Sequence, residues 1–462
     1  MKILFCASEA YPFAKSGGLA DVAYALPRAM AQKEQVTLLL PWYRFSHLPK
    51  EPSFLFETVV TFGGNSYAFS FYRLEFAGLE VVLVRTPLLY ERETLYGEGG
   101  GYADNDLRFT LFSRAIVLFA KEQKFDIVHL NDWHTALAAL FAKEQKLSAK
   151  IVFTIHNLAF QGVFPKERME VLGLDAHYFH MELLEFYGQI NFMKAGIVFC
   201  DALTTVSPTY AKEILTPEFG FGLEGFLQKY SFKLSGIVNG IDTAFFDPKT
   251  DPMLTCRLKR KVSTFKKCNQ KAFWGSKSDL PLFVFIGRLT EQKGVDLLLA
   301  LHEQLSSLPL RLALLGDGDD ATAAAFEQMA QAENIRFFRG YKEDLAHQMY
   351  AAADFLLMPS RFEPCGLNQM IAMRYGAIPV VRQTGGLADT VHEKGKKCGK
   401  GIVFAKAEAA ALQKALKKAL KLYAKQEKME AIRAFDVACD FSFAKSAKKY
   451  LKLYRQLEKE SV

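Results

Sequence analysis

The chain has 462 residues, of which 50% are hydrophobic and 23% are charged. Because one hydrophobic core rarely serves more than roughly 250–300 residues, we expect a soluble globular protein with two domains. The formal net charge of +8 weakly favours anionic partners such as phosphates. The densest basic run, from Lys414 to Lys428, alternates with Ala and Leu, which indicates a solvated helix face and no nucleic-acid patch.

Short apolar strands alternate with helical stretches from the start of the chain. The expected strands are rich in Val, Ile and Leu and cover Lys2–Ser8, Gln35–Leu40, Val81–Arg85, Ile127–Leu130, Ile151–Thr154 and Ala202–Val206. The expected helices between them cover Leu19–Ala31, Asp106–Lys121 and Thr135–Gln145. Strands that alternate with helices predict a parallel, doubly wound α/β sheet.

The same alternation of strands and helices begins again after a linker near residues 240–255, which is rich in Pro and Asp. The strands expected around and after this link are Ser235–Val238, Leu282–Gly287, Leu310–Leu315, Ile335–Phe338, Phe355–Met358 and Ile378–Val381. We therefore expect one Rossmann-like domain at residues 1–245 and a second at 246–440. Residues 441–462 are expected to form an amphipathic helix that can pack back on the N-terminal domain.

Seven cysteines lie far apart in the chain, and no C-x-x-C pair occurs. An odd, scattered set predicts reduced thiols in a cytosolic protein, and neither a disulfide frame nor a zinc site. The apolar run Met1–Ala7 is too short for a signal peptide. No apolar stretch reaches the roughly 18 residues needed to span a bilayer. A cytoplasmic protein without a membrane anchor is expected.

A five-residue motif occurs once in each half of the chain. The first copy is Gly17-Gly18-Leu19-Ala20-Asp21, and the second is Gly385-Gly386-Leu387-Ala388-Asp389. Each copy joins an expected strand to an expected helix, where backbone N–H groups and the helix dipole favour an anion. Ligands of open α/β sheets gather at the carboxyl ends of strands. Two matched loops therefore favour a ligand in a cleft between two domains over a pair of plain turns. Lys15, beside the first copy, suits a phosphate contact.

Two further loops follow strands of the second half. In Gly287–Gly294, Arg288 and Lys293 can both reach one diphosphate, and fixed positive charge of this kind stabilises a departing diphosphate. The Walker pattern G-x-x-x-x-G-K is absent, which argues against a P-loop NTPase. Glu363 can accept hydrogen bonds from sugar hydroxyls, and Cys365 is interpreted as a buried structural thiol.

Polar and aromatic residues end two strands of the N-terminal half. Asp132 and Trp133 follow one strand, and His156 follows the next. Such a cluster fits a sugar pocket, with an aromatic ring for the apolar face of the sugar and polar groups for its hydroxyls. His129 and His134 with Asp132 also suggest metal ligands, but the two histidines are neither four residues apart on a helix nor on one strand face. No metal site is expected.

Together these segments resemble the bacterial glycogen synthases and the plant starch synthases. The matching motifs run in order along nearly the whole chain and are Lys15–Asp21, Asn131–His134, Thr154–Gly162, Val238–Asp242, Ser360–Leu367 and Thr384–Asp389. The resemblance implies two Rossmann-like domains that face a deep cleft, the GT-B architecture. It also implies transfer of glucose from ADP-glucose to the non-reducing end of an α-1,4-glucan such as glycogen, with retention at the anomeric carbon and with neither metal nor cofactor.

The resemblance further implies roles for individual residues. The catalytic residues it implies are Lys15, His156, Arg288, Lys293 and Glu363. Among these, Lys15 contacts the donor, His156 lies beside the anomeric centre, Arg288 and Lys293 hold the departing diphosphate, and Glu363 orients the glucose or its nucleotide. The substrate contacts it implies are Gly17, Gly18, Asp21, Asp132, Trp133, Asn239, Gly287, Tyr341, Cys365, Gly366, Thr384, Gly385 and Gly386. Tyr341 is expected to stack on the base, and the Gly385-Gly386 backbone to cradle phosphate.

Two positions depart from the family pattern. Ser16 stands where the family usually has Thr, so the hydroxyl is kept. Ile371 stands eight residues after Glu363, where related retaining transferases carry a second Glu. Double displacement needs a carboxylate close to the anomeric carbon, and none is evident. The favoured hypothesis is a front-face route in which a leaving-group oxygen takes the proton of the incoming glucan hydroxyl.

Three alternatives remain. Another enzyme of the same architecture would use UDP-glucose or a different acceptor, and Tyr341 would stack on uracil as well as on adenine. A glucan phosphorylase would need a lysine that carries pyridoxal phosphate. A non-catalytic glucan-binding protein would bind glycogen without turning over a sugar nucleotide, but the intact set of Lys15, Arg288 and Lys293 argues against it.

Overall fold

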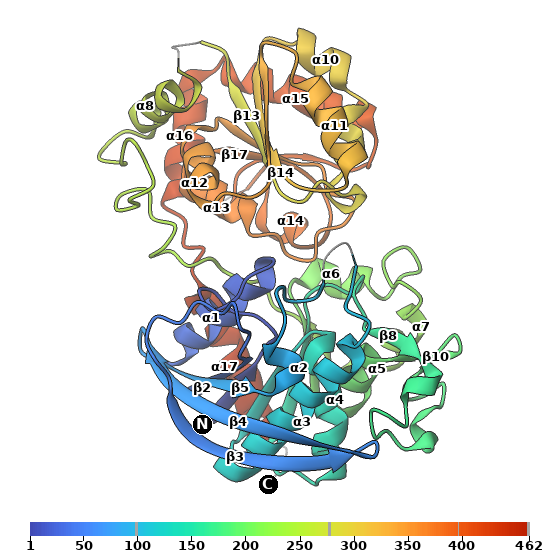
Figure 1. The fold of residues 1–462 in the computed structure, drawn as a ribbon. Coiled ribbons are helices and arrows are strands. Elements are labelled where there is room, and N and C mark those ends of the chain that lie inside the picture. Colours follow the sequence, from blue (N-terminus) through green and yellow to red (C-terminus); the bar gives the residue numbers. More distant parts are fainter. Residues whose placement is uncertain (98–99, 276–278, 396, 460–462) are drawn as a thin grey trace. The chain divides into compact units, whose positions relative to one another are not determined.

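The chain divides into two compact units (Figure 1). Unit 1 comprises Met1–Gly240 and Phe443–Val462, and unit 2 comprises Ile241–Ser442. The computed structural model describes residues 1–97, 100–275, 279–395 and 397–459. The chain thus enters unit 2 shortly before the expected boundary at residue 245, and its last helix belongs to unit 1. No helix within the described ranges is both long and apolar enough to cross a membrane.

Unit 1 is built on a nine-stranded sheet with the order β12-β11-β7-β6-β1-β2-β5-β4-β3. Its strands are β1 (Lys2–Cys6), β2 (Gln35–Pro41), β3 (Ser53–Phe62), β4 (Asn65–Phe76), β5 (Leu79–Arg85), β6 (Ile127–Asn131), β7 (Lys150–Ile155), β11 (Ala202–Thr205) and β12 (Leu234–Gly236). Neighbouring strands from β12 to β5 are parallel, as predicted. The buried runs of Val, Ile, Leu and Phe on these strands form the core.

Helices cover this sheet. They are α1 (Gly18–Met30), α2 (Pro87–Tyr90), α3 (Asn105–Gln123), α4 (Trp133–Glu144), α5 (Phe192–Phe199), α6 (Pro208–Glu213), α7 (Glu224–Lys229) and α17 (Phe443–Lys459), with short 3₁₀-helices η1 (Lys166–Arg168), η2 (Ala176–Tyr178) and η3 (Ser231–Lys233). A separate three-stranded sheet, β8-β10-β9, contains β8 (Val163–Pro165), β9 (Glu185–Phe186) and β10 (Gln189–Asn191). This small sheet was not predicted.

An antiparallel hairpin at the edge of the large sheet departs from the predicted parallel arrangement. β3 and β4 form the long blue ribbon in Figure 1 and pair antiparallel around Gly63-Gly64. The φ angles of these two glycines are 55° and 74°, as a two-residue hairpin turn requires. Along β3 the side chains alternate between exposed and half-buried positions. The segment therefore lacks the continuous apolar run that revealed the parallel strands.

The C-terminal helix completes the core of unit 1. Phe443, Tyr450 and Tyr454 of α17 are buried in the same hydrophobic cluster as α1. The Tyr454 hydroxyl lies 2.6 Å from Nδ1 of His129, and Nε2 of His129 lies 2.6 Å from the Thr154 hydroxyl. Burial holds the pKa of His129 well below its ordinary value. His129 is therefore a neutral core residue engaged at both ring nitrogens.

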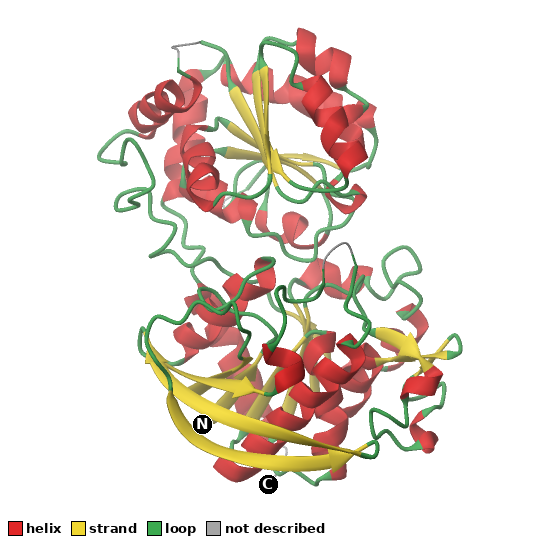
Figure 2. Cartoon of the chain, viewed as in Figure 1, coloured by secondary structure: helices red, strands yellow, loops and turns green. Residues whose placement is uncertain are grey.

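Unit 2 is built on a six-stranded parallel sheet with the order β15-β14-β13-β16-β17-β18, and helices flank its strands on both sides (Figure 2). The strands are β13 (Leu282–Ile286), β14 (Arg311–Gly316), β15 (Ile335–Arg339), β16 (Phe355–Met358), β17 (Ile378–Arg382) and β18 (Ile402–Phe404). The helices are α8 (Val262–Trp274), η4 (Glu291–Lys293), α9 (Val295–Leu299), α10 (His302–Ser307), α11 (Asp320–Met329), α12 (Glu343–Ala352), α13 (Asn368–Arg374), α14 (Gly385–Thr390), α15 (Ala409–Tyr423) and α16 (Gln426–Val437). The doubly wound sheet predicted for this half is confirmed.

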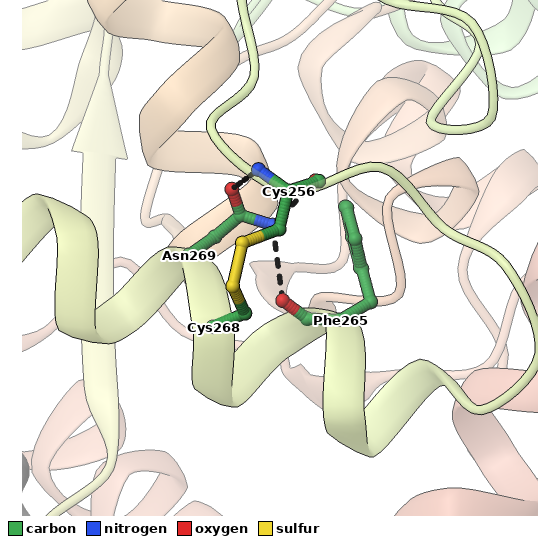
Figure 3. Close-up of a disulfide and its surroundings, with 4 residues drawn as sticks. All are labelled: Cys256, Phe265, Cys268 and Asn269. Atoms are coloured by element: carbon green, nitrogen blue, oxygen red, sulfur yellow. Dashed lines mark hydrogen bonds between the residues drawn. A yellow bond between two sulfur atoms is a disulfide. The ribbon is translucent and has the colours of Figure 1, made fainter.

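Two disulfides contradict the expectation that the cysteines are reduced thiols. Cys256–Cys268 ties the segment that enters unit 2 to α8 (Figure 3), and Cys398–Cys439 ties a loop to the end of α16. The Asn269 side chain accepts the Cys256 N–H at 3.1 Å and donates to the Cys256 carbonyl at 2.9 Å. The partners are 12 and 41 residues apart, so only the fold brings them together.

We expect protein unfolded in guanidinium without reductant to expose three reactive thiols, because only Cys6, Cys200 and Cys365 are unpaired. After reduction, all seven cysteines should react. A colorimetric thiol titration with a dithiobis reagent measures both values. Seven thiols before reduction would contradict both pairs.

Candidate active site

Three loops that are far apart in sequence follow neighbouring strands of unit 2. β13, β16 and β17 are adjacent in the sheet and are followed by Gly287–Gly294, Ser360–Gly366 and Thr384–Gly386. Because parallel strands end at the same edge of a sheet, the three loops line one face of the unit. The structure therefore brings together the predicted residues of these three loops, whereas Tyr341 follows β15 at the edge of the same sheet.

Lys293 and Glu363 form an ion pair within this set of loops. The distance from Lys293 Nζ to Glu363 Oε2 is 2.6 Å, and the Ser360 hydroxyl donates to the same oxygen at 3.0 Å. The Glu363 side chain is only 6% exposed, and that of Lys293 is 21% exposed. Two charges this poorly hydrated depend strongly on each other. Glu363 is thus a carboxylate held by a cation and a hydroxyl.

Gly385 and Gly386 allow the Glu363 loop to approach closely. A β-carbon on Gly385 would lie 2.0 Å from the Glu363 carbonyl oxygen, and one on Gly386 would lie 2.1 Å from that of Cys365. The Gly386 N–H donates to the carbonyl oxygens of Glu363 and Pro364 at 3.0 and 3.2 Å. The Gly386 N–H is therefore used inside the protein, and the phosphate cradle expected from the sequence stays a prediction. By contrast, a β-carbon on Gly17 would meet no atom within 4 Å.

The other expected donor contacts differ in exposure. Arg288 is exposed, and its Nη2 donates to Oε1 of Gln292 at 3.4 Å. The Gly287 N–H donates to the Leu315 carbonyl at 3.0 Å, which fixes the loop to β14. The Tyr341 side chain is 57% exposed, with its hydroxyl donating to Glu343 at 2.8 Å. Arg288 and Tyr341 can therefore meet a ligand at the surface of unit 2.

Cys365, Gly366 and Thr384 hold the loops in shape. Cys365 is a buried thiol, as predicted. The Gln369 side chain donates to the carbonyl oxygens of Cys365 and Gly366 at 3.1 and 2.9 Å. Thr384 is fully buried at the start of α14, and its carbonyl accepts the Leu387 N–H at 3.0 Å. These contacts explain why small or polar residues stand at these positions.

In unit 1, Glu9 holds the first glycine loop, and this role was not predicted. It follows β1, is 3% exposed, and accepts the N–H and the hydroxyl of Ser16, the latter at 3.0 Å. The Tyr96 hydroxyl donates to it at 3.3 Å. Burial raises the pKa of Glu9 from its ordinary 4.5 to about 7. The only signal in the sequence was a carboxyl directly after an apolar strand.

The loop that Glu9 supports carries three of the expected donor contacts. Gly17 and Gly18 are exposed at the start of α1. Lys15 pairs with Asp21 in the first turn of α1, with 2.9 Å between Nζ and Oδ1. Both of these side chains remain about one-quarter exposed, at 24% and 26%. Lys15 is thus held in place at the surface by Asp21.

Asp132 and His156 meet at the carboxyl ends of β6 and β7. Asp132 has a φ of 57°, and its Oδ1 accepts the His156 N–H at 2.7 Å. Burial raises the pKa of Asp132 from 3.8 to about 7. Because the Asn131 amide donates to the Cys6 carbonyl at 2.9 Å, its Oδ1, 2.8 Å from His156 Nε2, accepts the imidazole N–H. Burial lowers the pKa of His156 to about 3, so the ring is neutral and its Nδ1 is an acceptor.

Trp133 packs inside unit 1 and does not offer the open ring face that was expected for a sugar. Its side chain is 9% exposed and meets Phe109 edge-on at 5.0 Å. A β-carbon on Gly162 would lie 2.4 Å from this ring. Trp133 therefore supports the loop from His156 to Gly162. Across the residues that the structure describes, no group of three or more His, Cys, Asp or Glu side chains is arranged to hold a metal ion.

Asn239 is the remaining expected sugar contact in unit 1. It is 6% exposed, and its Oδ1 has no hydrogen-bond partner within the described part of the chain. A buried acceptor without a partner costs about 1–3 kcal/mol. Because this oxygen has almost no exposed surface, a ligand hydroxyl could bond to it only after neighbouring groups move. This is the chemistry expected of a sugar-binding amide.

Two Rossmann-like units with cationic and polar loops at their strand ends define a glycosyltransferase of the GT-B fold. A model of the starch synthase catalytic domain matches residues 2–229, and a model of glycosyl transferases group 1 matches 266–433. The glycogen synthases of Aquifex aeolicus and Bacillus subtilis are 42% and 40% identical, over 99% of this chain and 99% and 98% of theirs. The chain belongs to the family of the glycogen and starch synthases, which confirms the resemblance found in the sequence.

Solved structures agree with this assignment. The catalytic domain of starch synthase IV from Arabidopsis thaliana, bound to ADP and acarbose, superposes with a TM-score of 0.91 at 33% identity, over 99% of both chains. A sucrose-phosphate synthase from Thermosynechococcus elongatus is 17% identical with a TM-score of 0.66, over 99% of this chain and 98% of that one. The second structure shares the fold alone.

Replacing Glu9 by Gln is expected to change how stability depends on pH. The raised pKa means that this carboxyl stabilises the fold fully below about pH 4.5, and that the stabilisation is lost as the pH rises through about 7. The amide stays neutral throughout. The free energy of unfolding of the variant, relative to wild type, should therefore increase by on the order of 3 kcal/mol between pH 4.5 and about pH 8. Urea unfolding across this range measures it, and a constant difference would contradict the role of Glu9.

Removal of Lys293 tests the ion pair. Lys293→Met leaves the buried Glu363 carboxylate without its cation and should lower the free energy of unfolding by about 3 kcal/mol. Adding Glu363→Gln to that variant should recover most of the loss, because the neutral amide needs no counter-charge. Urea unfolding of both variants and of Glu363→Gln alone closes the cycle. A double variant no more stable than Lys293→Met would show that the pair is unimportant to the fold.

Proposed function

We propose that this glycosyltransferase moves glucose from ADP-glucose to the non-reducing end of an α-1,4-glucan, with retention of configuration, in glycogen biosynthesis. The observation that carries the proposal is the grouping of Arg288, Lys293 and Glu363 on loops at neighbouring strand ends of unit 2. The relative from Arabidopsis thaliana that binds ADP and acarbose supports a nucleotide donor and a glucan acceptor. We further propose a cytoplasmic location, although disulfides are rare in that compartment.

Unit 2 would bind the nucleotide. Arg288 and Lys293 supply fixed positive charge to the diphosphate, whose negative charge grows as the bond to glucose breaks. The exposed ring of Tyr341 stacks on the base. The short distance between Lys293 and Glu363 means that Lys293 is already in position before the donor binds. Glu363 then both orients this cation and accepts a hydrogen bond from the donor.

Unit 1 would bind the sugar and part of the donor. Neutral His156 offers Nδ1 as an acceptor to a glucose hydroxyl, since Nε2–H is held by Asn131. Asn239 would accept from another hydroxyl through its amide oxygen once neighbouring groups move to expose it. Gly17, with open space around its α-carbon, lets a phosphate or sugar approach the backbone of the loop, beside Lys15. Asp132 acts by orienting His156 through its backbone N–H.

The chemistry that these residues favour is a front-face transfer. The bond between the anomeric carbon and the diphosphate oxygen breaks, and the acceptor 4-hydroxyl oxygen bonds to the same face of that carbon. Its proton passes to the departing diphosphate oxygen, so ADP leaves and the α-linkage is kept. Double displacement is disfavoured for two reasons. Glu363 is engaged by Lys293 and Ser360, and Ile371 stands eight residues later, where related retaining transferases carry a second Glu. His156 is no general acid, because burial lowers its pKa to about 3.

Labelled ADP-glucose incubated with glycogen is expected to give labelled polymer, and UDP-glucose to give much less. Arg288→Gln is expected to lower kcat by about 10²-fold, because it removes an exposed cation that stabilises the departing diphosphate. Equal use of both donors would reject the preference for ADP-glucose. Glycogen binding without incorporation from either donor would favour a non-catalytic protein. Absorbance of a pyridoxal cofactor would favour a phosphorylase.

A further inference from the structure

The disulfide between Cys398 and Cys439 joins two segments of unit 2 that are 41 residues apart. Cys439 follows α16 and is 5% exposed, whereas Cys398 is exposed. The bond can therefore be reached by a thiol in solution from the side of Cys398. Disulfides of cytoplasmic proteins, when they occur, are mostly transient and redox-sensing. With the location proposed above, this bond is thus a candidate for reversible exchange.

Gly399, the residue after Cys398, lies against the last residue of α14. A β-carbon on Gly399 would lie 1.8 Å from the Thr390 carbonyl oxygen, so the two backbones touch. The Gly399 carbonyl accepts the His392 N–H at 2.7 Å. The φ angle of Gly399 is 87°, which residues with a side chain rarely adopt. The disulfide thus holds a segment that is packed directly on the end of α14.

Thr390 is also bonded to the residues that shape the Glu363 loop. Its hydroxyl donates to the Gly386 carbonyl at 2.6 Å and lies 3.0 Å from the Gln369 amide, which donates to it. The same amide donates to the Cys365 carbonyl at 3.1 Å. The Gly386 N–H donates to the Glu363 carbonyl at 3.0 Å. A continuous set of contacts therefore runs from the disulfide to this loop within unit 2.

We propose that Cys398–Cys439 is a site of reversible thiol–disulfide exchange with a dithiol reductant, and that its opening loosens the Glu363 loop. A thiolate of the reductant attacks Sγ of Cys398, the S–S bond breaks, and Cys439 leaves as a thiolate that takes a proton. The second thiol of the reductant then displaces Cys398 from the mixed disulfide. Two electrons pass to the protein, which gains two thiols, and the dithiol becomes a disulfide.

Asp436 limits how far the segment moves after reduction. Its Oδ1 accepts the Lys400 N–H at 2.8 Å, and it belongs to α16, the helix that precedes Cys439. This hydrogen bond remains when the disulfide opens, so the segment is loosened but not released. The Glu363 loop should then open more often while unit 2 stays folded. Slower glucose transfer would follow, and this consequence alone rests on the proposed function.

The disulfide between Cys256 and Cys268 provides a matched control in the same unit (Figure 3). Asn269 of α8 holds Cys256 itself, because its side chain accepts the Cys256 N–H and donates to the Cys256 carbonyl. The Cys256 segment therefore keeps its place when that disulfide opens. Reduction of this bond should leave the Glu363 loop as it was.

The buried thiol of Cys365 reports on the loop that it shares with Glu363. Folded protein is incubated with reduced or oxidised dithiothreitol, freed of it without air, and treated with N-ethylmaleimide. Mass spectrometry of the peptides gives the rate of alkylation at each cysteine. Reduced dithiothreitol should convert Cys398 and Cys439 into thiols, and Cys365 should then react about tenfold faster, because the loop opens more often. Reoxidation should restore the slow rate.

Two double variants separate the disulfides. Cys398→Ser with Cys439→Ser should give the fast rate at Cys365 with or without dithiothreitol. Cys256→Ser with Cys268→Ser should respond to dithiothreitol as the wild type does. In the reduced wild type, kcat/KM for ADP-glucose is expected to fall about fivefold and to recover on reoxidation.

The thiols of Cys6 and Cys200, both buried in unit 1, are internal references whose rates should not change. A Cys398–Cys439 bond that stays closed in folded protein under excess dithiothreitol would overturn the proposal, as would an unchanged rate at Cys365 once the bond is open. Faster alkylation of Cys365 with unchanged kcat/KM would overturn the effect on transfer. If wild-type protein transfers no glucose, the proposed function fails, and the rate at Cys365 still decides the exchange and the loosening.

Discussion

The contact on which the loops at the strand ends of unit 2 depend is one of backbone with backbone. Gly385 and Gly386 lie against the carbonyl oxygens of Glu363 and Cys365, at a separation that leaves no room for any side chain. This approach joins the loops after β16 and β17 and fixes where the Glu363 carboxylate stands. Lys293 is positioned by that carboxylate in turn. A side chain at either glycine would therefore move the acid and the cation together.

Much of the fold was predictable because the parallel strands are buried on both faces. Their continuous runs of Val, Ile, Leu and Phe mark them without ambiguity, as β13 (Leu282–Ile286) shows. The antiparallel hairpin of β3 and β4 was not predicted, because its position at the edge of the sheet leaves one face in contact with water. The disulfide between Cys398 and Cys439 was not predicted, because it depends on which loops the completed fold brings together. The local pattern of apolar residues therefore predicts which strands are buried, but it does not predict which distant segments of the chain lie close together.

The candidate site divides in the same way. Lys293 and Glu363 stood in predicted loops, but their direct pairing was not foreseen, because it depends on the order of β13 and β16 in the sheet. Trp133 was expected to face a sugar, yet the absence of a side chain at Gly162 lets the ring pack inward. Glu9 was missed because its partners, Ser16 and Tyr96, are joined to it only in three dimensions. Residue type suggested the chemistry, and packing decided where each side chain lies and which partners it has.

Helix α17 has a consequence for the order in which the protein is made. Unit 1 contains both the first strand and the last helix, so all of unit 2 is synthesised before unit 1 has its full core. Until Tyr454 has left the ribosome, His129 lacks one of its two partners inside the sheet. Nascent chains would thus carry a finished unit 2 and an unfinished unit 1. A premature stop within the final helix would damage unit 1 while leaving unit 2 intact.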